Sequence, residues 1–479
     1  MAGNVNSAPG QAHWSSRAAF VLAAVGSAVG LGNLWRFPSE AGANGGGAFV
    51  LIYVLCVALI GAPLLLAETL IGRHGQRSTI GSAAILAKQS GASSGWAALA
   101  VIGLIANFLI LTFYSVVAGW VLYYVATSLG DVAGAVASGQ PFAGAYAGLT
   151  TEQVRAQMPD LFADPGKMLI FHAVFAIITT FIVARGVKSG IEVAAVWLMP
   201  AFFLLLIGIT AYSAVVGDLA AAAAFLFQPD FQRAIQPQVL NSALGQAFFS
   251  LSLGGGAMVA YGAYASRETN LSSSAGTIAF ADTAVAIVAG LAIFPIVFSV
   301  GLSPDAGPTL MFQTLPAAFH SMPGGALVAL AFFVLAFFAA VTSSVSLLEI
   351  GVGWVMERFK LGRVLTSSLL GLGFFLIGLV SLFSFNIWAD QRPLPFLPGF
   401  ENATWFDAID GVTGKLLLPL SGLITAIFIG WVADKKLVDP ETGLRPGRFL
   451  PLWRALIAWV CPLAVALILL FGLFPQLIS

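Results

Sequence analysis

Residues 26–33 read GSAVGLGN, and residues 250–256 read SLSLGGG. Each stretch lies inside an apolar run long enough to cross a bilayer as a helix, which takes about 20 residues. Glycine costs roughly 1 kcal/mol per site in a helix interior, so these glycines predict an unwound stretch in each helix. Unwound backbone at bilayer depth is tolerated only where it lines a cavity. We therefore expect two broken helices around a binding site; the alternative is that the glycines serve only close helix packing.

The composition of the whole chain is that of a polytopic membrane protein. Of its 479 residues, 59% are hydrophobic and only 9% are charged, whereas an average soluble domain has roughly 25% charged residues. The 21 basic and 21 acidic residues give a formal net charge of zero, which excludes nucleic acid as the main partner. Cys56 and Cys461 both lie in apolar runs, so neither a disulfide framework nor a thiolate metal cluster is expected.

Eleven apolar runs recur along the chain, and the two glycine-rich stretches open successive blocks of five. The expected fold class is an all-α membrane protein with about 11 transmembrane helices, built as a 5+5 inverted repeat with unwound helices 1 and 6. The expected spans are 17–37, 45–71, 95–128, 167–184, 190–216, 241–265, 276–301, 324–358, 362–383, 403–433 and 449–475. The expected organisation is a flexible cytoplasmic tail (1–13), a first repeat (14–216), a second repeat (217–433), and a cytoplasmic loop with the last span (434–479).

The distribution of basic residues predicts the orientation of these spans. Fifteen of the 21 Lys and Arg fall on the side of the N-terminus, and positive residues are retained in the cytoplasm. We therefore expect a multi-pass protein of the cell inner membrane with a cytoplasmic N-terminus and a C-terminus outside. The six basic residues on the other side are Arg36, Arg155, Lys167, Arg233, Arg392 and Lys415.

Polar residues inside the apolar runs indicate what the cavity binds. A broken helix exposes free carbonyl groups on one half and free N–H groups on the other, so it can hold a cation beside a carboxylate. Asp282 lies far from either end of its span, where an unpaired carboxylate is costly and a bound cation would compensate it; a protonated or helix-paired Asp is the alternative. The hydroxyls of Thr342, Ser343 and Ser344 are further cation ligands, unless they only bond back to their own helix.

Three strings carry a resemblance to a known family: AVGSAVGLGNLWRFP (24–38), ANGGGAF (43–49) and GQAFFSLSLGGGAMVAYGAY (245–264). They strongly resemble the neurotransmitter:sodium symporter family, which includes bacterial sodium-coupled amino-acid transporters. The resemblance extends through spans one to ten. It implies an amino-acid importer driven by sodium entry through alternating access, and not an enzyme. The sequence also has no HExxH or GxSxG motif.

Matching motif positions implies two sodium sites and one substrate site. The first sodium site would use Ala28, Asn33, Ser250 and Asp282. The second would use Gly26, Val29, Ala339, Thr342 and Ser343. The substrate site implied by the resemblance draws on spans one, three, six and eight: Ser27, Ala28, Gly30, Gly32, Ile110, Tyr114, Phe249, Ser250, Ser252, Gly255, Ser343 and Leu347.

The resemblance also implies gates and a hinge. Arg36 and Asp410 match the outer gate pair, with a plain surface salt bridge as the alternative. Phe249 matches the lid above the substrate, and Trp14, Tyr264 and Glu357 match inner gate positions. Gly190 and Pro200 match a Gly-x9-Pro motif that lets the start of span five unwind, where an ordinary proline kink is the alternative.

Two departures from the family refine the expected function. Chloride-dependent members have Asn and Ser where this chain has Asp282 and Ala286, so we expect chloride-independent transport. Many members place a bulky residue at the position of Gly255, so we expect a large hydrophobic or aromatic amino acid as the substrate, unless neighbours refill the space.

The expected partners are sodium, the amino acid and the lipid bilayer, while the oligomeric state stays open. A transport-inactive sensor and a sodium channel are the alternative functions.

Overall fold

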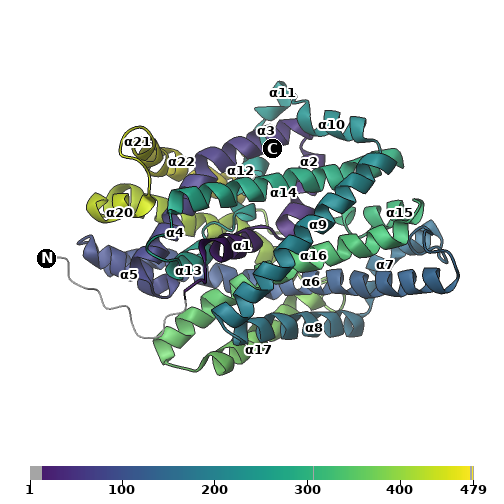
Figure 1. The fold of residues 1–479 in the computed structure, drawn as a ribbon, viewed down its shortest axis with the longest axis horizontal. Coiled ribbons are helices and arrows are strands. Elements are labelled where there is room, and N and C mark those ends of the chain that lie inside the picture. Colours follow the sequence, from purple (N-terminus) through teal and green to yellow (C-terminus); the bar gives the residue numbers. More distant parts are fainter. Residues whose placement is uncertain (1–12, 306, 475–476, 478–479) are drawn as a thin grey trace.

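The computed structural model describes residues 13–305, 307–474 and 477, and this part of the chain is all-helical (Figure 1). The expected tail therefore lies outside the described residues except for His13. The helices are α1 (Arg17–Ala28), α2 (Phe37–Ala43), α3 (Gly47–Cys56), α4 (Ala62–Gly75), α5 (Thr79–Gln89), α6 (Ala98–Ala137), α7 (Thr151–Ala163), α8 (Pro165–Ala184), α9 (Val193–Val216), α10 (Leu219–Phe227), α11 (Phe231–Ala234), α12 (Pro237–Ser250), α13 (Ala257–Ala263), α14 (Leu271–Ser299), α15 (Thr314–His320), α16 (Gly325–Phe359), α17 (Arg363–Phe383), α18 (Trp405–Gly411), α19 (Leu418–Ile427), α20 (Lys435–Thr442), α21 (Phe449–Ala455) and α22 (Cys461–Leu473).

Nine uninterrupted helical stretches in the described residues are long and apolar enough to cross a membrane, and the bent pair α1 and α2 makes a tenth. Several of these stretches join two helices through a π-helical turn, as α3 and α4 do in Gly47–Gly75. The pair α12 and α13 stands where the sixth span was expected. The two helices have 14 and 7 residues, so each alone is shorter than the stretch of about 20 residues that a bilayer crossing takes. The all-α polytopic fold class predicted from the sequence is confirmed.

The first broken helix interrupts its hydrogen bonding at the glycine-rich stretch. Helix α1 ends at Ala28, and Val29 adopts an extended backbone with ψ of 99°. A π-helical turn then spans Gly32–Arg36 and leads into α2. The two halves are bent by 49°, so the carbonyl groups at the end of α1 and the N–H groups before α2 face a common space.

The second break is the segment 251–256 between α12 and α13. Ser252, Gly254 and Gly256 have φ values of 53°, 76° and 80°, a left-handed backbone that glycine adopts without steric cost. The N–H of Gly254 donates to Oε1 of Glu68 at 2.7 Å, and Asn107 donates a hydrogen bond to the carbonyl oxygen of Gly255. Side chains from α4 and α6 therefore satisfy backbone groups that the missing helical turn leaves free.

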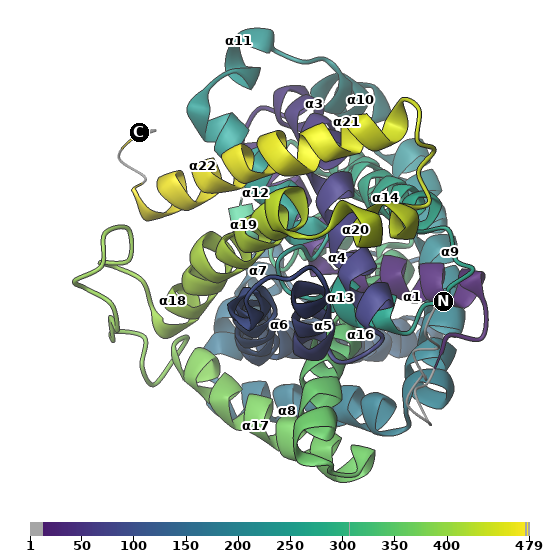
Figure 2. The same cartoon turned by 90° about the vertical axis from the view of Figure 1, so that its left-hand side faces the viewer.

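The two ends of the bundle differ in what they carry. Helices α5 and α20 lie at one end, on the left of Figure 1, and α7 and α15 lie at the other. Between them α16 packs along α6, and α1 contacts α9, α14 and α16. Helices α8 and α17 lie side by side at one edge of the bundle in both views (Figures 1 and 2). The first broken helix is thus packed among long unbroken helices.

An ionic cluster joins α20 to α4 and to the segment after α13, at the end of the bundle that holds α5. Glu441 pairs with Arg73 at 2.7 Å and with Arg267 at 2.9 Å, and His74 lies 3.5 Å away. Arg73 is only 4% exposed, so Glu441 compensates a charge that water cannot reach. Burial acts to raise the pKa of Glu441, but the hydrogen bond from His74 and the charges of Arg73 and Arg267 lower that pKa below its ordinary value.

We predict that Glu441→Gln lowers the thermal midpoint of the detergent-solubilised protein, with a loss of about 3 kcal/mol, because Arg73 loses its buried counter-charge. Because the folded pKa of Glu441 is lowered, its contribution is complete above the ordinary carboxyl pKa of about 4.3 and disappears as the pH falls through the lowered value. The difference between wild type and variant should shrink over that acidic range. Glu268→Gln, at an exposed acid on the same end, is the control, and an equal shift in both variants would contradict the prediction.

Candidate functional site

A cavity of about 50 Å³ lies between the two breaks, enclosed by side chains from both broken helices, α6, α16 and α19. Eleven of the twelve substrate-site residues expected from the sequence line it. Its full lining is Ser27, Ala28, Gly30, Leu31, Gly32, Asn107, Ile110, Tyr114, Phe249, Ser250, Ser252, Ser343, Leu347 and Leu418.

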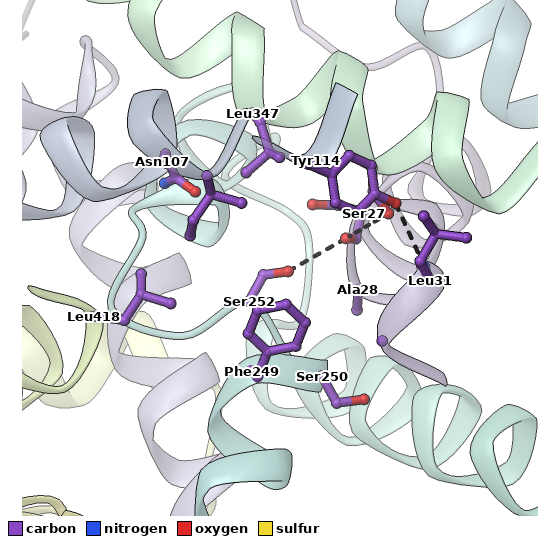
Figure 3. Close-up of a pocket in the computed structure, with 14 residues that line it drawn as sticks. Ser27, Ala28, Leu31, Asn107, Tyr114, Phe249, Ser250, Ser252, Leu347 and Leu418 are labelled. Atoms are coloured by element: carbon purple, nitrogen blue, oxygen red, sulfur yellow. Dashed lines mark hydrogen bonds between the residues drawn. The ribbon is translucent and has the colours of Figure 1, made fainter. Parts of the chain in front are cut away.

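The cavity has a polar end and a more apolar end (Figure 3). At the polar end the N–H of Leu31 donates to the hydroxyl of Tyr114 at 3.4 Å, and the hydroxyl of Ser252 donates to the carbonyl of Ser27 at 3.3 Å. Asn107 and Leu418 lie at the opposite end in Figure 3. A ligand that fits this cavity therefore carries polar groups at one end and an apolar body at the other.

The first group of oxygen atoms surrounds Asp282, beside the polar end. Asn33 Nδ2 lies 2.8 Å from Asp282 Oδ1, and the Ser250 hydroxyl donates to Asp282 Oδ2 at 2.7 Å. Tyr53 adds a hydroxyl at 3.3 Å. Asn33, Ser250 and Asp282, the three side chains expected to bind the first sodium ion, are at most 1% exposed. Among the described residues no basic side chain pairs with this carboxylate, so its charge is compensated only by neutral hydrogen-bond donors.

The second group gathers backbone carbonyls around one hydroxyl. The Ser343 hydroxyl lies 3.3 Å from the carbonyl oxygen of Gly26 and 3.4 Å from that of Val29. Thr342 Oγ1 lies 3.1 Å from the carbonyl oxygen of Ala339. A hydroxyl has a single proton, so Ser343 can satisfy only one of the carbonyls it faces. The Thr342 hydroxyl thus bonds back to its own helix, whereas the Ser343 hydroxyl faces the carbonyl groups at the end of α1.

Glycine at position 26 allows this approach of α1 to α16. A Cβ atom there would lie 3.0 Å from the sulfur of Met199 and 3.2 Å from Cβ of Thr342. Glycine at this position therefore lets α1 pack closely against α9 and α16, which keeps the carbonyl oxygens of α1 near the hydroxyls of α16.

A vestibule of about 320 Å³ lies above the cavity, toward α2 and α18. Phe249 and Tyr114 line both spaces, so Phe249 stands between them. The Arg36 guanidinium carbon lies 4.6 Å from the centroid of the Phe249 ring. Arg36 pairs with Glu40 at 3.8 Å and not with Asp410, although both expected gate residues line the vestibule. This end of the pathway is therefore not closed by the expected salt bridge.

The opposite end is closed by Trp14. The Trp14 indole nitrogen donates to the carbonyl of Tyr261 at 3.1 Å, and its backbone N–H donates to the carbonyl of Tyr264 at 3.2 Å. The Trp14 and Tyr264 rings meet edge to face, with centroids 6.1 Å apart. Trp14 is 7% exposed, so the chain before α1 seals the end that carries the ionic cluster.

Glu357 lies at this end as well, but its hydrogen bond comes from the turn between α4 and α5 and not from Tyr264. It accepts a hydrogen bond from the N–H of Ser78 at 2.7 Å and lies 3.9 Å from Arg77. The carboxylate that Tyr264 contacts is Glu349, at 2.8 Å, and Arg363 binds Glu349 through two nitrogens. Glu349 is eight residues, about two helical turns, deeper in α16 than Glu357, and this depth explains why it reaches Tyr264.

The expected hinge precedes α9. Gly190 lies in a π-helical turn, Val187–Glu192, where a Cβ atom would collide with the carbonyl of Ile182. Pro200 lies inside α9, where it removes one backbone donor. Glu192 accepts hydrogen bonds from the backbone and the hydroxyl of Ser15, which ties this turn to the segment carrying Trp14.

Gly255 is the one expected substrate-site residue that the structure does not bring to the cavity wall. A Cβ atom at Gly255 would lie 2.5 Å from Nδ2 of Asn107, and Asn107 donates to the carbonyl of Gly255. Asn107 thus fills the space that the missing side chain was expected to leave. This corrects the expected enlargement at Gly255: a neighbour has refilled that part of the pocket.

Sequence reasoning missed Asn107, Leu31 and Leu418. Asn107 was recognisable as the only amide in the apolar run 95–128, and it precedes Ile110 and Tyr114 by three and seven residues, which places all three on one helix face. Leu418 lies in a run of leucines with no distinguishing feature, so only the fold identifies it.

Comparison with known proteins gives concordant findings. A model of the sodium:neurotransmitter symporter family matches residues 11–135 and 162–475. The sodium-dependent transporter YhdH of Bacillus subtilis is 36% identical over 460 residues, which cover 95% of this chain and 96% of that protein. A sodium-dependent transporter of Haemophilus influenzae is 33% identical over 470 residues, 96% of this chain and 98% of its own length. The crystal structure of MhsT in complex with L-phenylalanine has a TM-score of 0.85 and 39% identity, and covers 97% of this chain and 100% of that chain.

We predict that Gly254→Ala destabilises the protein by about 2 kcal/mol or more. A left-handed backbone costs an L-residue roughly 1–2 kcal/mol, and the new methyl group would also meet the backbone carbonyl of Leu418. The thermal midpoint in detergent should fall. Gly245→Ala, in α12 with open space around its Cβ position, is the matched control and should melt like wild type; wild-type melting of Gly254→Ala would show that the second break is not held tightly.

Proposed function

Because this chain belongs to the sodium:neurotransmitter symporter family and is a sodium-dependent transporter, we propose that it imports large hydrophobic or aromatic L-amino acids with two sodium ions, without chloride. The observation that carries this proposal is a cavity with one polar and one apolar end, flanked on both sides by groups of oxygen atoms. The partner in the MhsT crystal structure is L-phenylalanine, an amino acid of this class.

The first sodium ion would bind at Asp282. A buried carboxylate without a basic partner is expensive, and a monovalent cation offsets that cost. Asn33 now directs its amide nitrogen to Asp282, so ion binding would turn its oxygen inward, beside the Ser250 hydroxyl and the carbonyl of Ala28. Because Ala28 and Ser250 also line the cavity, the carboxylate of a bound amino acid would contact the same ion.

The second sodium ion would bind among the carbonyls of Gly26, Val29 and Ala339 and the hydroxyls of Thr342 and Ser343. Hard oxygen ligands suit a hard cation. With the ion in place, each carbonyl would have a positive partner, and the Ser343 proton would be free to point elsewhere. This ion would tie α1 to α16, two helices that must separate for the closed end to open.

The amino acid would lie along the axis of the cavity. Its carboxylate would face the N–H groups at residues 30–32 and the Tyr114 hydroxyl, and its amino group would face the carbonyls near Ser27, Phe249 and Ser252. Its side chain would extend toward Ile110, Leu347 and Leu418, with Asn107 limiting the depth. Burying apolar area gains about 25 cal/mol per Å², so this end favours large apolar side chains over glycine or alanine.

Transport would proceed by alternating access. The vestibule with separated Arg36 and Asp410, and the seal made by Trp14, correspond to a form entered from the vestibule past Phe249. Opening of the other end would require Trp14 to leave Tyr261 and Tyr264. The contact of Ser15 with Glu192 would couple that departure to unwinding of the turn at Gly190.

The orientation proposed is that expected from the sequence: an inner-membrane protein with its N-terminus in the cytoplasm and its C-terminus outside. The clustering of Arg73, Arg77, Arg267 and Arg363 at the end sealed by Trp14 supports it, since basic residues are retained inside. The vestibule then opens to the outside.

We predict that the protein in proteoliposomes accumulates radiolabelled tryptophan and leucine under an inward sodium gradient, and that replacing sodium with potassium abolishes accumulation.

We also predict that Gly30→Ala lowers this uptake about tenfold, the equivalent of roughly 1.4 kcal/mol, because the new methyl group would lie 2.6 Å from the Ser343 hydroxyl. Gly276→Ala, whose Cβ position is in open space, should transport normally.

Three results would revise this proposal. Sodium-dependent binding without accumulation would identify a sensor. Uncoupled sodium flux would identify a channel. Stronger competition by alanine or glycine than by tryptophan and leucine would overturn the proposed substrate class while leaving sodium symport in place.

We predict that uptake by the wild type is unchanged when gluconate replaces chloride. Asp282 supplies the fixed negative charge beside the first sodium ion, and the residue one turn later is Ala286, which offers no hydroxyl. The double variant Asp282→Asn, Ala286→Ser should require chloride for uptake. A chloride requirement in the wild type that disappeared in the double variant would contradict the prediction.

A further inference from the structure

A groove of about 520 Å³ runs along the lipid-facing edge of the bundle, between α8 and α17, and its lining shares no residue with that of the substrate cavity. Helices α8 and α17 lie side by side there, at the bottom of Figures 1 and 2. Small residues form the floor, because Gly371 lets α17 approach Thr180 of α8 so closely that a Cβ atom would collide with it. Ile177, Phe181 and Leu372 form exposed walls.

The groove has the length of one bilayer leaflet. Its lining on α8 runs from Ala173 to Ala184, which is about 17 Å at 1.5 Å per residue. Half of a hydrocarbon core of about 30 Å is about 15 Å. On α17 the lining runs from Val364 to Phe375, so both walls begin at the end of the bundle that holds the basic residues. A single acyl chain fits this depth and chemistry.

Basic residues follow α8 and precede α17 in the chain, next to the helix ends at which the groove begins. Arg185 directly follows α8, and its guanidinium carbon lies 5.7 Å from the ring of Phe181, which lines the groove. Lys188 is in the turn that follows, and Arg358 and Lys360 are at the end of α16, next to the start of α17. All four are exposed.

These four cations have no carboxylate partner within 4.0 Å in the described part of the chain. The carboxylates of the same region have other partners: Glu349 binds Arg363, Glu357 pairs with Arg77, and Glu192 accepts a hydrogen bond from Ser15. This end of the groove therefore carries uncompensated positive charge where a lipid headgroup would lie.

We propose that the groove between α8 and α17 is a binding site for one anionic phospholipid, with an acyl chain along the groove and the phosphate group at Arg185, Lys188, Arg358 and Lys360. Apolar contact alone would accept any lipid. The four cations add selectivity for a net negative headgroup, at roughly 1 kcal/mol for each basic residue near the surface.

The test is native mass spectrometry of the delipidated protein, titrated with phosphatidylglycerol or with phosphatidylcholine of the same acyl chains. We expect one tightly retained phosphatidylglycerol and at least tenfold weaker retention of phosphatidylcholine. The double variant Arg185→Gln, Lys188→Gln should weaken phosphatidylglycerol binding about 30-fold. Ser368→Phe, which fills the groove from an exposed position, should abolish the preferred site.

The matched control is Lys435→Gln, Lys436→Gln, which removes two exposed cations from α20 at the same end of the bundle and should leave binding unchanged. Soluble glycerol phosphate at the same concentration should not compete. Equal retention of the two lipids, competition by glycerol phosphate, or an equal loss in the control would each overturn the proposal. So would a lipid-free dimer that Ser368→Phe dissociates, because a second copy would then occupy the groove.

Discussion

Backbone groups at bilayer depth must find partners inside the protein, and this constraint governs the centre of the molecule. Two helices are interrupted there, and each interruption leaves donors and acceptors without their helical partners. Glu68 takes the N–H of Gly254, Asn33 takes the N–H of Gly30 at 3.1 Å, and Ser343 faces the carbonyls at the end of α1. The side chains that repair the breaks are largely those that build the site.

The binding elements share atoms, and this sharing gives coupling a physical basis. Ser343 lines the cavity and belongs to the second group of oxygens, while Ser250 lines the cavity and belongs to the first. A ligand in the cavity therefore alters the surroundings of both groups. Two ligands that stabilise the same arrangement must raise each other's affinity, by thermodynamic reciprocity. Coupling of this kind requires no long pathway, because the cavity shares Ser250 with the first group of oxygen atoms and Ser343 with the second.

The sequence was sufficient to predict the all-α fold and both breaks, because glycine clusters are rare in apolar helices. The grouping of Asn33, Ser250 and Asp282 was implied by the family resemblance, and the three side chains do lie together. The sequence was insufficient where the outcome depends on competition between neighbours. Gly255 has no side chain, which predicted free space beside it, yet Asn107 from another helix fills that space. Arg36 has both Glu40 and Asp410 within its surroundings, and the partner one turn away was selected. Glu349 and Glu357 differ only in depth along α16, a quantity that a hydropathy pattern does not resolve.

The hydrogen bond from Gly254 to Glu68 also constrains how the protein is made. Its partners are 186 residues apart, in different halves of the chain, and Glu68 is only 1% exposed in the finished protein. At ribosomal speeds of about 5–20 residues per second, α4 is synthesised roughly 10–40 s before the loop that satisfies its carboxyl group. During that interval the carboxyl group of Glu68 lacks the backbone N–H that it accepts from in the folded protein. The first half of the polypeptide therefore gains this hydrogen bond only after the second half has been made.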